Sequence, residues 1–129
     1  MHDGIRTKLR ELYAEQGLSI DGEKLERLTA GVMADARRSQ MTRVDLLEFS
    51  EDYNTGKPDV NGNIIAFQGD SANPASPYSA TTIDQAVRTP AEDSYRQFDV
   101  ATQQQTQQWD RFVAQEQELS QSRGMHHSL

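Results

Sequence analysis

The amino-acid sequence predicts an α+β domain: two N-terminal helices packed on a small antiparallel sheet of two or three strands, one further helix, and a disordered glutamine-rich C-terminal tail. Three observations carry this prediction. Apolar residues recur at helical spacing before residue 40, and two short segments after it are rich in β-branched and aromatic residues. A helical pattern that starts at a proline follows from residue 90.

The first helix is expected between Gly4 and Gln16. Its apolar residues recur on one face: Ile5, Leu9, Leu12 and Tyr13. Gly17 follows them, and glycine is the residue that most readily ends a helix. The pattern therefore predicts an amphipathic helix that stops at Gly17.

A second amphipathic helix is expected from about Asp21, with Glu23 in its first turn. Its apolar face carries Leu25, Leu28, Val32 and Ala36. Arg37 and Arg38 follow, where the carboxyl end of a helix favours cations. Because only residues 17–22 join the two helices, we expect them to pack antiparallel.

Two short segments then favour strands, residues 42–49 and residues 63–68, since both are rich in β-branched, leucyl and aromatic residues. Residues 51–62 hold asparagines, glycines and a proline, which suits a long exposed connection in a hairpin. Residues 69–77 form a further loop with two X-Pro pairs. Residues 78–81 would supply the third strand.

Two reciprocal helix caps are expected next, in which a hydroxyl and an acid or amide three residues later bond each other's backbone. One pairs Thr82 with Gln85, and the other pairs Thr89 with Glu92. Pro90 lies at the first helical position of the second, where its missing N–H costs nothing. A helix is therefore predicted to start at Pro90.

We expect residues 1–100 to form the folded domain and residues 101–129 to form a flexible tail. Eight glutamines lie in the tail, at positions 103, 104, 105, 107, 108, 115, 117 and 121. Such a segment buries too little apolar surface to offset an ordering cost of about 1–2 kcal/mol per residue.

Trp109, Phe112 and Val113 interrupt the glutamines and would share one face of a helix. One interpretation is an anchor that gains about 2–5 kcal/mol of gross burial in a partner's groove. The other is that this helix folds back and Trp109 completes the core. The sequence leaves both open.

Composition excludes several classes of protein. The chain has 129 residues, of which 35% are hydrophobic, so there is room for one domain with a small core. Its net charge of −7 opposes nonspecific binding to nucleic acid or to an anionic membrane. It has no cysteine for a disulfide, and no apolar run approaches the length that crosses a bilayer. The first sixteen residues do not resemble a secretory signal.

The residues give no positive argument for catalysis, a cofactor or a metal. Four side chains match positions of a calcium loop: Asp59, Asn61, Asn63 and Asp70. Ile64 stands where that loop needs glycine, so a solvated hairpin loop explains them better. The adjacent acids Glu51 and Asp52 are expected to be solvated, and His126 and His127 to be a frayed end.

Four segments precede the glutamine-rich end in a fixed order: residues 28–45 (LTAGVMADARRSQMTRVD), residues 65–70 (IAFQGD), residues 73–74 (NP) and residues 89–94 (TPAEDS). In this order and spacing they resemble the XVIPCD, the C-terminal domain of antibacterial effectors exported by xanthomonad type IV secretion systems. The resemblance runs from about residue 5 to residue 121.

Three family motifs are carried over residue by residue. The Gly-Leu-x-Arg-Ile-Asp-His-Val motif falls on residues 40–47, with Arg43 and Asp45 kept and the glycine and histidine replaced by Gln40 and Leu46. The Val-Gln-Gly segment falls on Phe67, Gln68 and Gly69, and Asn73-Pro74 follows. The Thr-Pro-x-x-x-Ser motif falls on Thr89, Pro90 and Ser94. Residues 75–79 depart from the family's Ala-His-x-Arg-Ala stretch.

The resemblance implies a transport signal that the coupling ATPase of a type IV secretion system recognises in the cytoplasm of the donor bacterium. The signal would carry a fused toxin domain into a target bacterium during interbacterial competition. The domain itself would be no enzyme and would need no cofactor. We expect a monomer without membrane insertion or nucleic-acid binding, and a cognate immunity protein would contact only the toxin domain.

The expected partner-binding residues are Arg43, Asp45, Gln68, Gly69, Thr89, Pro90, Ser94, Gln103, Gln104, Gln105, Trp109 and Phe112. Arg43 with Asp45 is either a structural ion pair or an interface contact, and Gln68-Gly69 either sets a turn or meets the partner. The alternative functions are a small standalone hydrolase or effector acting through hairpin-loop acids, and an immunity or adaptor protein that binds a toxin.

Overall fold

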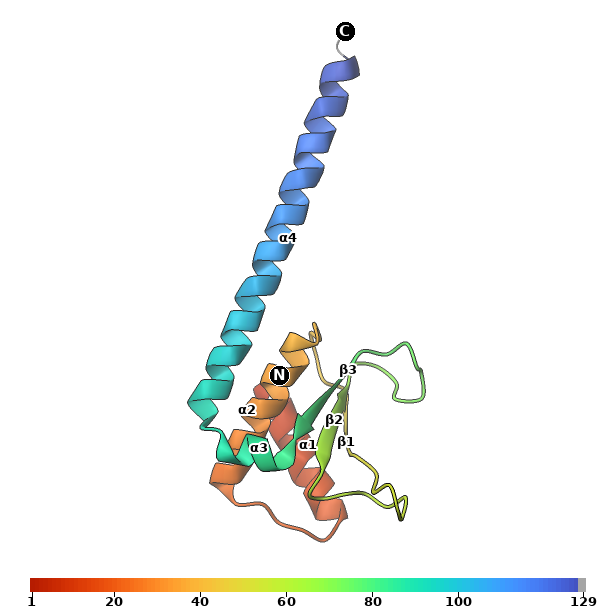
Figure 1. Ribbon diagram of the computed structural model, residues 1–129, viewed down its shortest axis with the longest axis vertical. Helices are drawn as coiled ribbons and strands as arrows, with labels where there is room; N and C mark the ends of the chain where they lie inside the picture. Colours follow the sequence, from red (N-terminus) through yellow and green to blue (C-terminus); the bar gives the residue numbers. More distant parts are fainter. Residues whose placement is uncertain (128–129) are drawn as a thin grey trace.

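The computed structural model describes the backbone of residues 1–127 and the side chains of residues 1–118. Seven elements follow one another along the chain: α1 (His2–Glu15), α2 (Gly22–Arg38), β1 (Leu46–Phe49), β2 (Asn63–Phe67), β3 (Tyr78–Thr82), α3 (Ile83–Arg88) and α4 (Ala91–His127). The strands form one antiparallel sheet in the order β1-β2-β3. The predicted α+β class is therefore confirmed, with three strands (Figure 1).

Helices α1 and α2 pack against the sheet and enclose the core between them. The largest fully buried apolar side chains come from α1, α2, the loop after α2 and β2: Ile5, Leu9, Leu25, Leu28, Val32, Met41 and Ile64. Tyr13 of α1 meets Phe49 of β1 edge to face, with ring centroids 5.2 Å apart. The apolar faces predicted for the two helices are the faces that the structure buries.

Both N-terminal helices end in a Schellman motif. After α1, Gly17 has φ +69, and the N–H of Leu18 donates to the carbonyl of Tyr13. After α2, Gln40 occupies the same left-handed position with φ +64, and the N–H of Met41 donates to the carbonyl of Ala36 at 3.0 Å. The predicted stop at Gly17 is confirmed, and at Gln40 a side chain occupies a conformation that glycine adopts most easily.

Helix α3 packs closely on α2, because a glycine lies where the two helices meet. A Cβ atom at Gly31 would come within 3.0 Å of the Cβ of Ala86. The glycine that weakens the helical pattern of α2 is thus the residue that lets α3 approach it.

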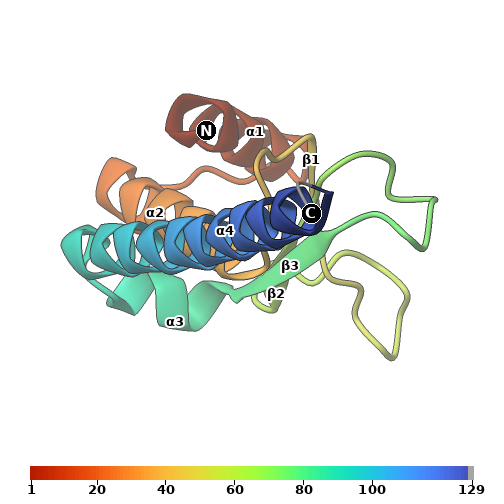
Figure 2. The same ribbon diagram turned by 90° about the horizontal axis from the view of Figure 1, so that it is seen from above.

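Helix α4 crosses α2 and then leaves the body, as Figure 2 shows from above. The Arg37 guanidinium lies over the Phe98 ring, 4.8 Å from its centroid. Contact continues beyond residue 100, since Ala101 is buried and the Gln105 amide donates to the carbonyl of Arg37.

The described structure continues α4 as one helix through residue 127, where the sequence suggested a flexible tail. Residues 91–123 contain neither glycine nor proline, and alanine, glutamine, glutamate and arginine all favour helices. The boundary at residue 100 and the flexibility of the tail in solution stay predictions. Residues 128 and 129 lie outside the described part, as do the side chains of Gln121, His126 and His127.

Three local expectations were wrong: the two helix caps and the start of the first strand. The Thr82 side chain makes no cap bond, and the Thr89 hydroxyl donates to the carbonyl of Gln85, four residues earlier. Thr89 therefore closes α3 instead of capping α4, although α4 does begin just after Pro90. Strand β1 begins at Leu46 rather than at residue 42, because side-chain bonds turn the chain before it.

No helix of the described residues, α4 included, is both long enough and apolar enough to cross a membrane.

Candidate partner-binding surface

Four of the predicted site residues form one cluster at the start of β1 and the end of β2, here called the knot: Arg43, Asp45, Gln68 and Gly69. The Asp45 Oδ2 atom accepts from the Arg43 Nε at 2.8 Å and from the Gly69 N–H at 2.6 Å. The Gln68 Oε1 accepts from the Thr42 N–H at 2.8 Å. Two segments 24 residues apart in the sequence are thus joined side chain to backbone.

The knot depends on the conformation of Gly69. Its φ of +94 lies in a region that other residues avoid, and this turn aims its N–H at the Asp45 carboxylate. The Gly69 N–H, followed by the Arg43 guanidinium, holds the pKa of Asp45 below its ordinary value. The Arg43 side chain nevertheless stays 62% exposed, so it stabilises the turn and still faces solvent.

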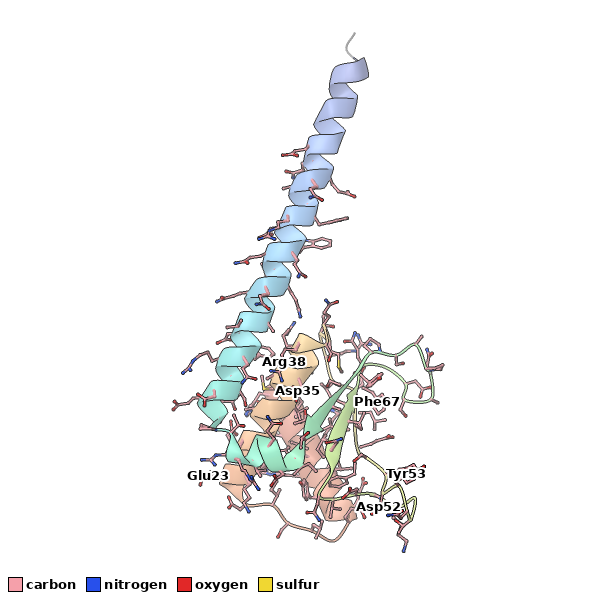
Figure 3. The ribbon with its side chains drawn as sticks, in the orientation of Figure 1. Glu23, Asp35, Arg38, Asp52, Tyr53 and Phe67 are labelled. Carbon is pink, nitrogen blue, oxygen red and sulfur yellow. The ribbon has the colours of Figure 1, made fainter. Side chains whose placement is uncertain are left out.

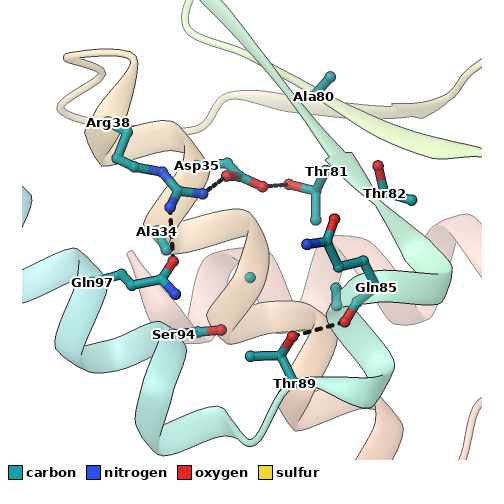
Figure 4. Close-up of a pocket in the computed structure, with 12 residues that line it drawn as sticks. Ala34, Asp35, Arg38, Ala80, Thr81, Thr82, Gln85, Thr89, Ser94 and Gln97 are labelled. Atoms are coloured by element: carbon teal, nitrogen blue, oxygen red, sulfur yellow. Dashed lines mark hydrogen bonds and ion pairs between the residues drawn. The ribbon is translucent and has the colours of Figure 1, made fainter.

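Two more predicted residues, Thr89 and Ser94, line a cleft of about 260 Å³. Helices α2, α3 and α4 and strand β3 form its walls, as the close-up in Figure 4 shows. Pro90 is exposed between them at the α3–α4 junction. This hollow is called the polar cleft below.

Asp35 on α2 is the charged centre of the polar cleft. Its Oδ2 accepts from the Thr81 hydroxyl of β3 at 2.7 Å, and its Oδ1 pairs with Arg38 one turn later (Figure 4). The Arg38 Nη1 donates onward to the Gln97 Oε1 of α4 at 2.7 Å. One chain of polar contacts therefore ties β3, α2 and α4 together.

The remaining predicted residues lie on the projecting part of α4. Trp109 is 64% exposed and Phe112 is 51% exposed, with ring centroids 5.7 Å apart. Gln105 is half-buried, whereas Gln103 and Gln104 are exposed. Of the two interpretations left open by the sequence, the one in which Trp109 completes the core is therefore wrong, since the continuous helix α4 carries Trp109 away from the body.

The two rings face the body across an open hollow of about 400 Å³. This hollow, called the aromatic ledge below, is lined by Gln40, Gln105, Gln108, Trp109 and Phe112. Gln40 is the residue of the body that lines the aromatic ledge, and it lies in the loop after α2.

One short segment touches all three features. Arg38 lines the polar cleft, Gln40 lines the aromatic ledge, and Thr42 bonds to the knot. The end of α2 and the loop after it thus bring together motif residues that are far apart in the sequence. Figure 3 shows Arg38 and Asp35 at this end of α2, beside the first turns of α4.

A further polar cluster, missed by the sequence analysis, lies where α1, α2 and α4 meet. The Glu26 carboxylate accepts from the His2 Nε2 at 2.9 Å, from the Arg6 Nη1 at 3.1 Å and from the Tyr95 hydroxyl. We call it the Glu26 hub. The phenol of Tyr95 gives no pattern in the sequence that reveals a partner 69 residues away.

The Glu26 hub shifts the pKa values of its members. The Tyr95 hydroxyl, then His2, lowers the pKa of Glu26. Hydrogen bonds to Asp3 and then to Glu26 raise the pKa of His2, and burial with the bond to Glu26 raises the pKa of Tyr95 to about 12. Tyr95 therefore remains a neutral donor at any physiological pH.

The knot, the polar cleft and the aromatic ledge all lie around the end of α2 and the loop after it. Among the described residues, no group of three or more histidines, cysteines and acids is placed to hold a metal ion. A family model described as X-Tfes, XVIPCD matches residues 1–100.

The chain belongs to the X-Tfes XVIPCD family, which confirms the resemblance seen in the sequence. This is a family of secretion-signal domains of type IV secretion effectors, not of catalytic domains. No curated protein was found to match the chain.

Proposed function

We propose that the coupling ATPase of a type IV secretion system recognises this domain in the donor cytoplasm and passes it, with a fused toxin, into a rival bacterium. The observation that carries the proposal is the family match over residues 1–100, which covers the knot and the polar cleft. This domain would act as the transport signal, and the fused toxin domain would act on the target bacterium.

The docking surface that we propose combines the aromatic ledge with the neighbouring knot. Trp109 and Phe112 offer exposed aromatic area, and burying such rings is worth about 2–5 kcal/mol before ordering costs. Exposed Arg43 adds a cation at the rim, where charges set specificity and encounter rate more than affinity. Gln103, Gln104 and Gln105 would supply amide hydrogen bonds along α4.

Residues 101–129 would work as an arm beside a rigid body. A segment that orders on contact loses affinity per unit area but gains reach and fast exchange, which suits a cargo that has to be released. We further expect the domain to act as a monomer, and a cognate immunity protein to bind the toxin domain alone. The net charge of −7 favours protein partners over nucleic acid.

A pull-down with the coupling ATPase tests the proposal. The intact chain should bind, and a chain lacking residues 103–129 should bind much more weakly. Binding that is unaffected by the truncation would show that residues 103–129 are not part of the docking surface. If the intact chain fails to bind, recognition by the coupling ATPase is refuted, and capture of a toxin instead would favour the immunity or adaptor alternative.

Point variants locate the contact more sharply. Trp109→Ala with Phe112→Ala should weaken binding at least tenfold, because both rings lose their burial. Tyr53→Ala is the matched control, since Tyr53 is a fully exposed aromatic residue on the β1–β2 loop, away from α4 (Figure 3). An equal loss in both proteins would show that aromatic exposure in general, not the aromatic ledge, drives binding.

A further inference from the structure

Strand β3 is an edge of the sheet, and its pairing with β2 fixes which backbone groups are free. The Ile83 N–H donates to the carbonyl of Gly62, and the Gln68 N–H donates to the carbonyl of Pro77. In an antiparallel pair such hydrogen-bonded positions alternate with positions that face outward. The N–H and C=O groups of Ala80 and Thr82 therefore point away from β2.

The N–H and C=O of Ala80 and the N–H of Thr82 are free at the polar cleft, because both residues are part of its lining, whereas the C=O of Thr82 begins the hydrogen bonding of α3. A strand edge with unpaired N–H and C=O groups is a template for another extended chain. The cleft thus offers an incoming backbone the hydrogen bonds that β2 does not use.

A buried hydroxyl faces the same space. Ser94 is only 4% exposed, and in Figure 4 its oxygen points into the cleft and takes part in none of the hydrogen bonds drawn. Because this hydroxyl lies at the surface of the cleft and no hydrogen bond to it is drawn, it can donate to or accept from a polar group of a ligand bound there. The Gln85 amide lines the cleft beside it.

The charges of the cleft specify an uncharged occupant. Asp35 and Arg38 pair with each other, the Thr81 hydroxyl donates to Asp35, and Arg38 donates to Gln97. A charged side chain would have to break this set of contacts, whereas an amide can both donate and accept beside Ser94 and Gln85. The cleft volume of about 260 Å³ suits one such side chain with a short piece of backbone.

The other free edge of the sheet, strand β1, differs because acidic side chains surround it. Strand β1 leaves the backbone N–H and C=O groups of Leu47 and Phe49 unpaired on its outer side, but five carboxylates line the groove beside it: Glu11, Glu15, Asp45, Glu48 and Glu51. Charges next to an edge strand are a common device against strand addition. The β1 edge can therefore serve as an internal control for peptide binding at the β3 edge.

We infer that the polar cleft is a docking site for an extended segment of a partner protein, which adds to the edge of β3 and inserts an asparagine or glutamine side chain toward Ser94. The inference rests on the proposed function in one respect: the partner is the coupling ATPase.

A peptide titration followed by backbone amide NMR tests the site without the ATPase. Acetyl-Thr-Gln-Thr-amide should shift the amide signals of Ala80, Thr82 and Ser94 in the full chain and leave those of Leu47 and Phe49 in place. Acetyl-Thr-Leu-Thr-amide has nearly the same shape without the amide and should bind about five- to tenfold more weakly. Absence of shifts at β3, or equal binding of both peptides, would overturn the inference.

Two serine variants separate the cleft from general stability. Ser94→Ala should abolish the preference for the glutamine peptide. Ser79→Ala is the matched control, because Ser79 is also only 4% exposed and does not line the cleft. Neither variant should have a lower free energy of unfolding than the parent, and loss of the preference in both would contradict the assigned role of Ser94.

Binding to the purified ATPase then distinguishes this inference from the proposed function. Ser94→Ala should weaken that binding about five- to tenfold. If it binds as well as the parent, the partner does not use the cleft, although recognition by the ATPase stands. If the peptide occupies the cleft but the ATPase does not bind the intact chain, the proposed function fails and the docking site remains.

Discussion

Gln40 is the residue whose backbone and side chain serve different purposes. It sits at the left-handed position of the Schellman motif after α2, with φ +64, where the family resemblance places a glycine. Its side chain also lines the aromatic ledge. The family glycine is thus explained by backbone conformation, and this chain accepts some strain at a position beside its proposed docking surface.

Replacing Gln40 by glycine should therefore stabilise the domain. The strain of a left-handed non-glycine residue is about 1 kcal/mol, part of which the greater freedom of glycine in the unfolded chain offsets. We expect Gln40→Gly to raise the free energy of unfolding by about 0.5 kcal/mol, measured by urea denaturation.

Gly69→Ala is the matched variant, and it should change the free energy of unfolding in the opposite direction. Gly69 has φ +94, so a side chain there should lower the free energy of unfolding by about 1 kcal/mol or more and loosen the knot. A destabilising Gln40→Gly would mean that the amide of Gln40 contributes more than its backbone strain costs.

At the scale of elements, the Glu26 hub decides how α4 is held against α1 and α2. Glu26 has a lowered pKa, so its contribution to stability is present above the unfolded value near 4.5 and is lost as the pH falls through the folded value. His2 has a raised pKa, so its contribution is present below about 6.5 and is lost as the pH rises through the folded value.

The hub should therefore stabilise the domain most between about pH 4.5 and pH 6.5. Glu26→Gln should flatten this dependence and lower stability by about 1 kcal/mol in that range, discounted for partial exposure of the group. Unfolding free energies measured from pH 3 to pH 9 test this. Glu23→Gln is the control, since Glu23 is an exposed acid of the same helix, paired only with Arg27. An identical pH profile in Glu26→Gln and the parent would refute the role of the hub.

The elements themselves could largely be predicted from local sequence. The faces of α1 and α2, the positions of β2 and β3 and the start of α4 after Pro90 all follow from spacing and from turn residues. The two caps were mispredicted because Thr82 belongs to the end of β3 and Thr89 bonds backward to Gln85. A local motif cannot indicate which of two adjoining elements will use a hydroxyl.

The candidate surface was predictable only in part. The pairing of Arg43 with Asp45 spans two residues and is visible in the sequence. The contact between Asp35 and Thr81 joins residues 46 apart, and the Glu26 hub joins three helices, so neither leaves a local pattern. Trp109 and Phe112 could be recognised as an apolar face, but only the direction of α4 shows that they stay outside the core.

At the scale of the whole molecule, the domain combines a small rigid body with a long projecting helix (Figure 1). The body presents the knot and the polar cleft, and α4 presents the aromatic ledge at a distance from the core. In the function that we propose, the body would give specificity while the arm would engage and release the partner. We expect a modest free energy of unfolding, since a cargo that passes a channel has to be unfolded, and a value above about 10 kcal/mol would argue against this.

Delivery itself tests the central claim most directly. The chain should be fused behind a reporter enzyme, and the activity of the reporter should be measured inside recipient bacteria mixed with donors that carry a type IV secretion system. The account predicts delivery by donors with an intact coupling ATPase, a loss of delivery without it, and reduced delivery of the variant with Trp109→Ala and Phe112→Ala. Equal reporter activity in recipients of donors with and without the coupling ATPase would contradict it.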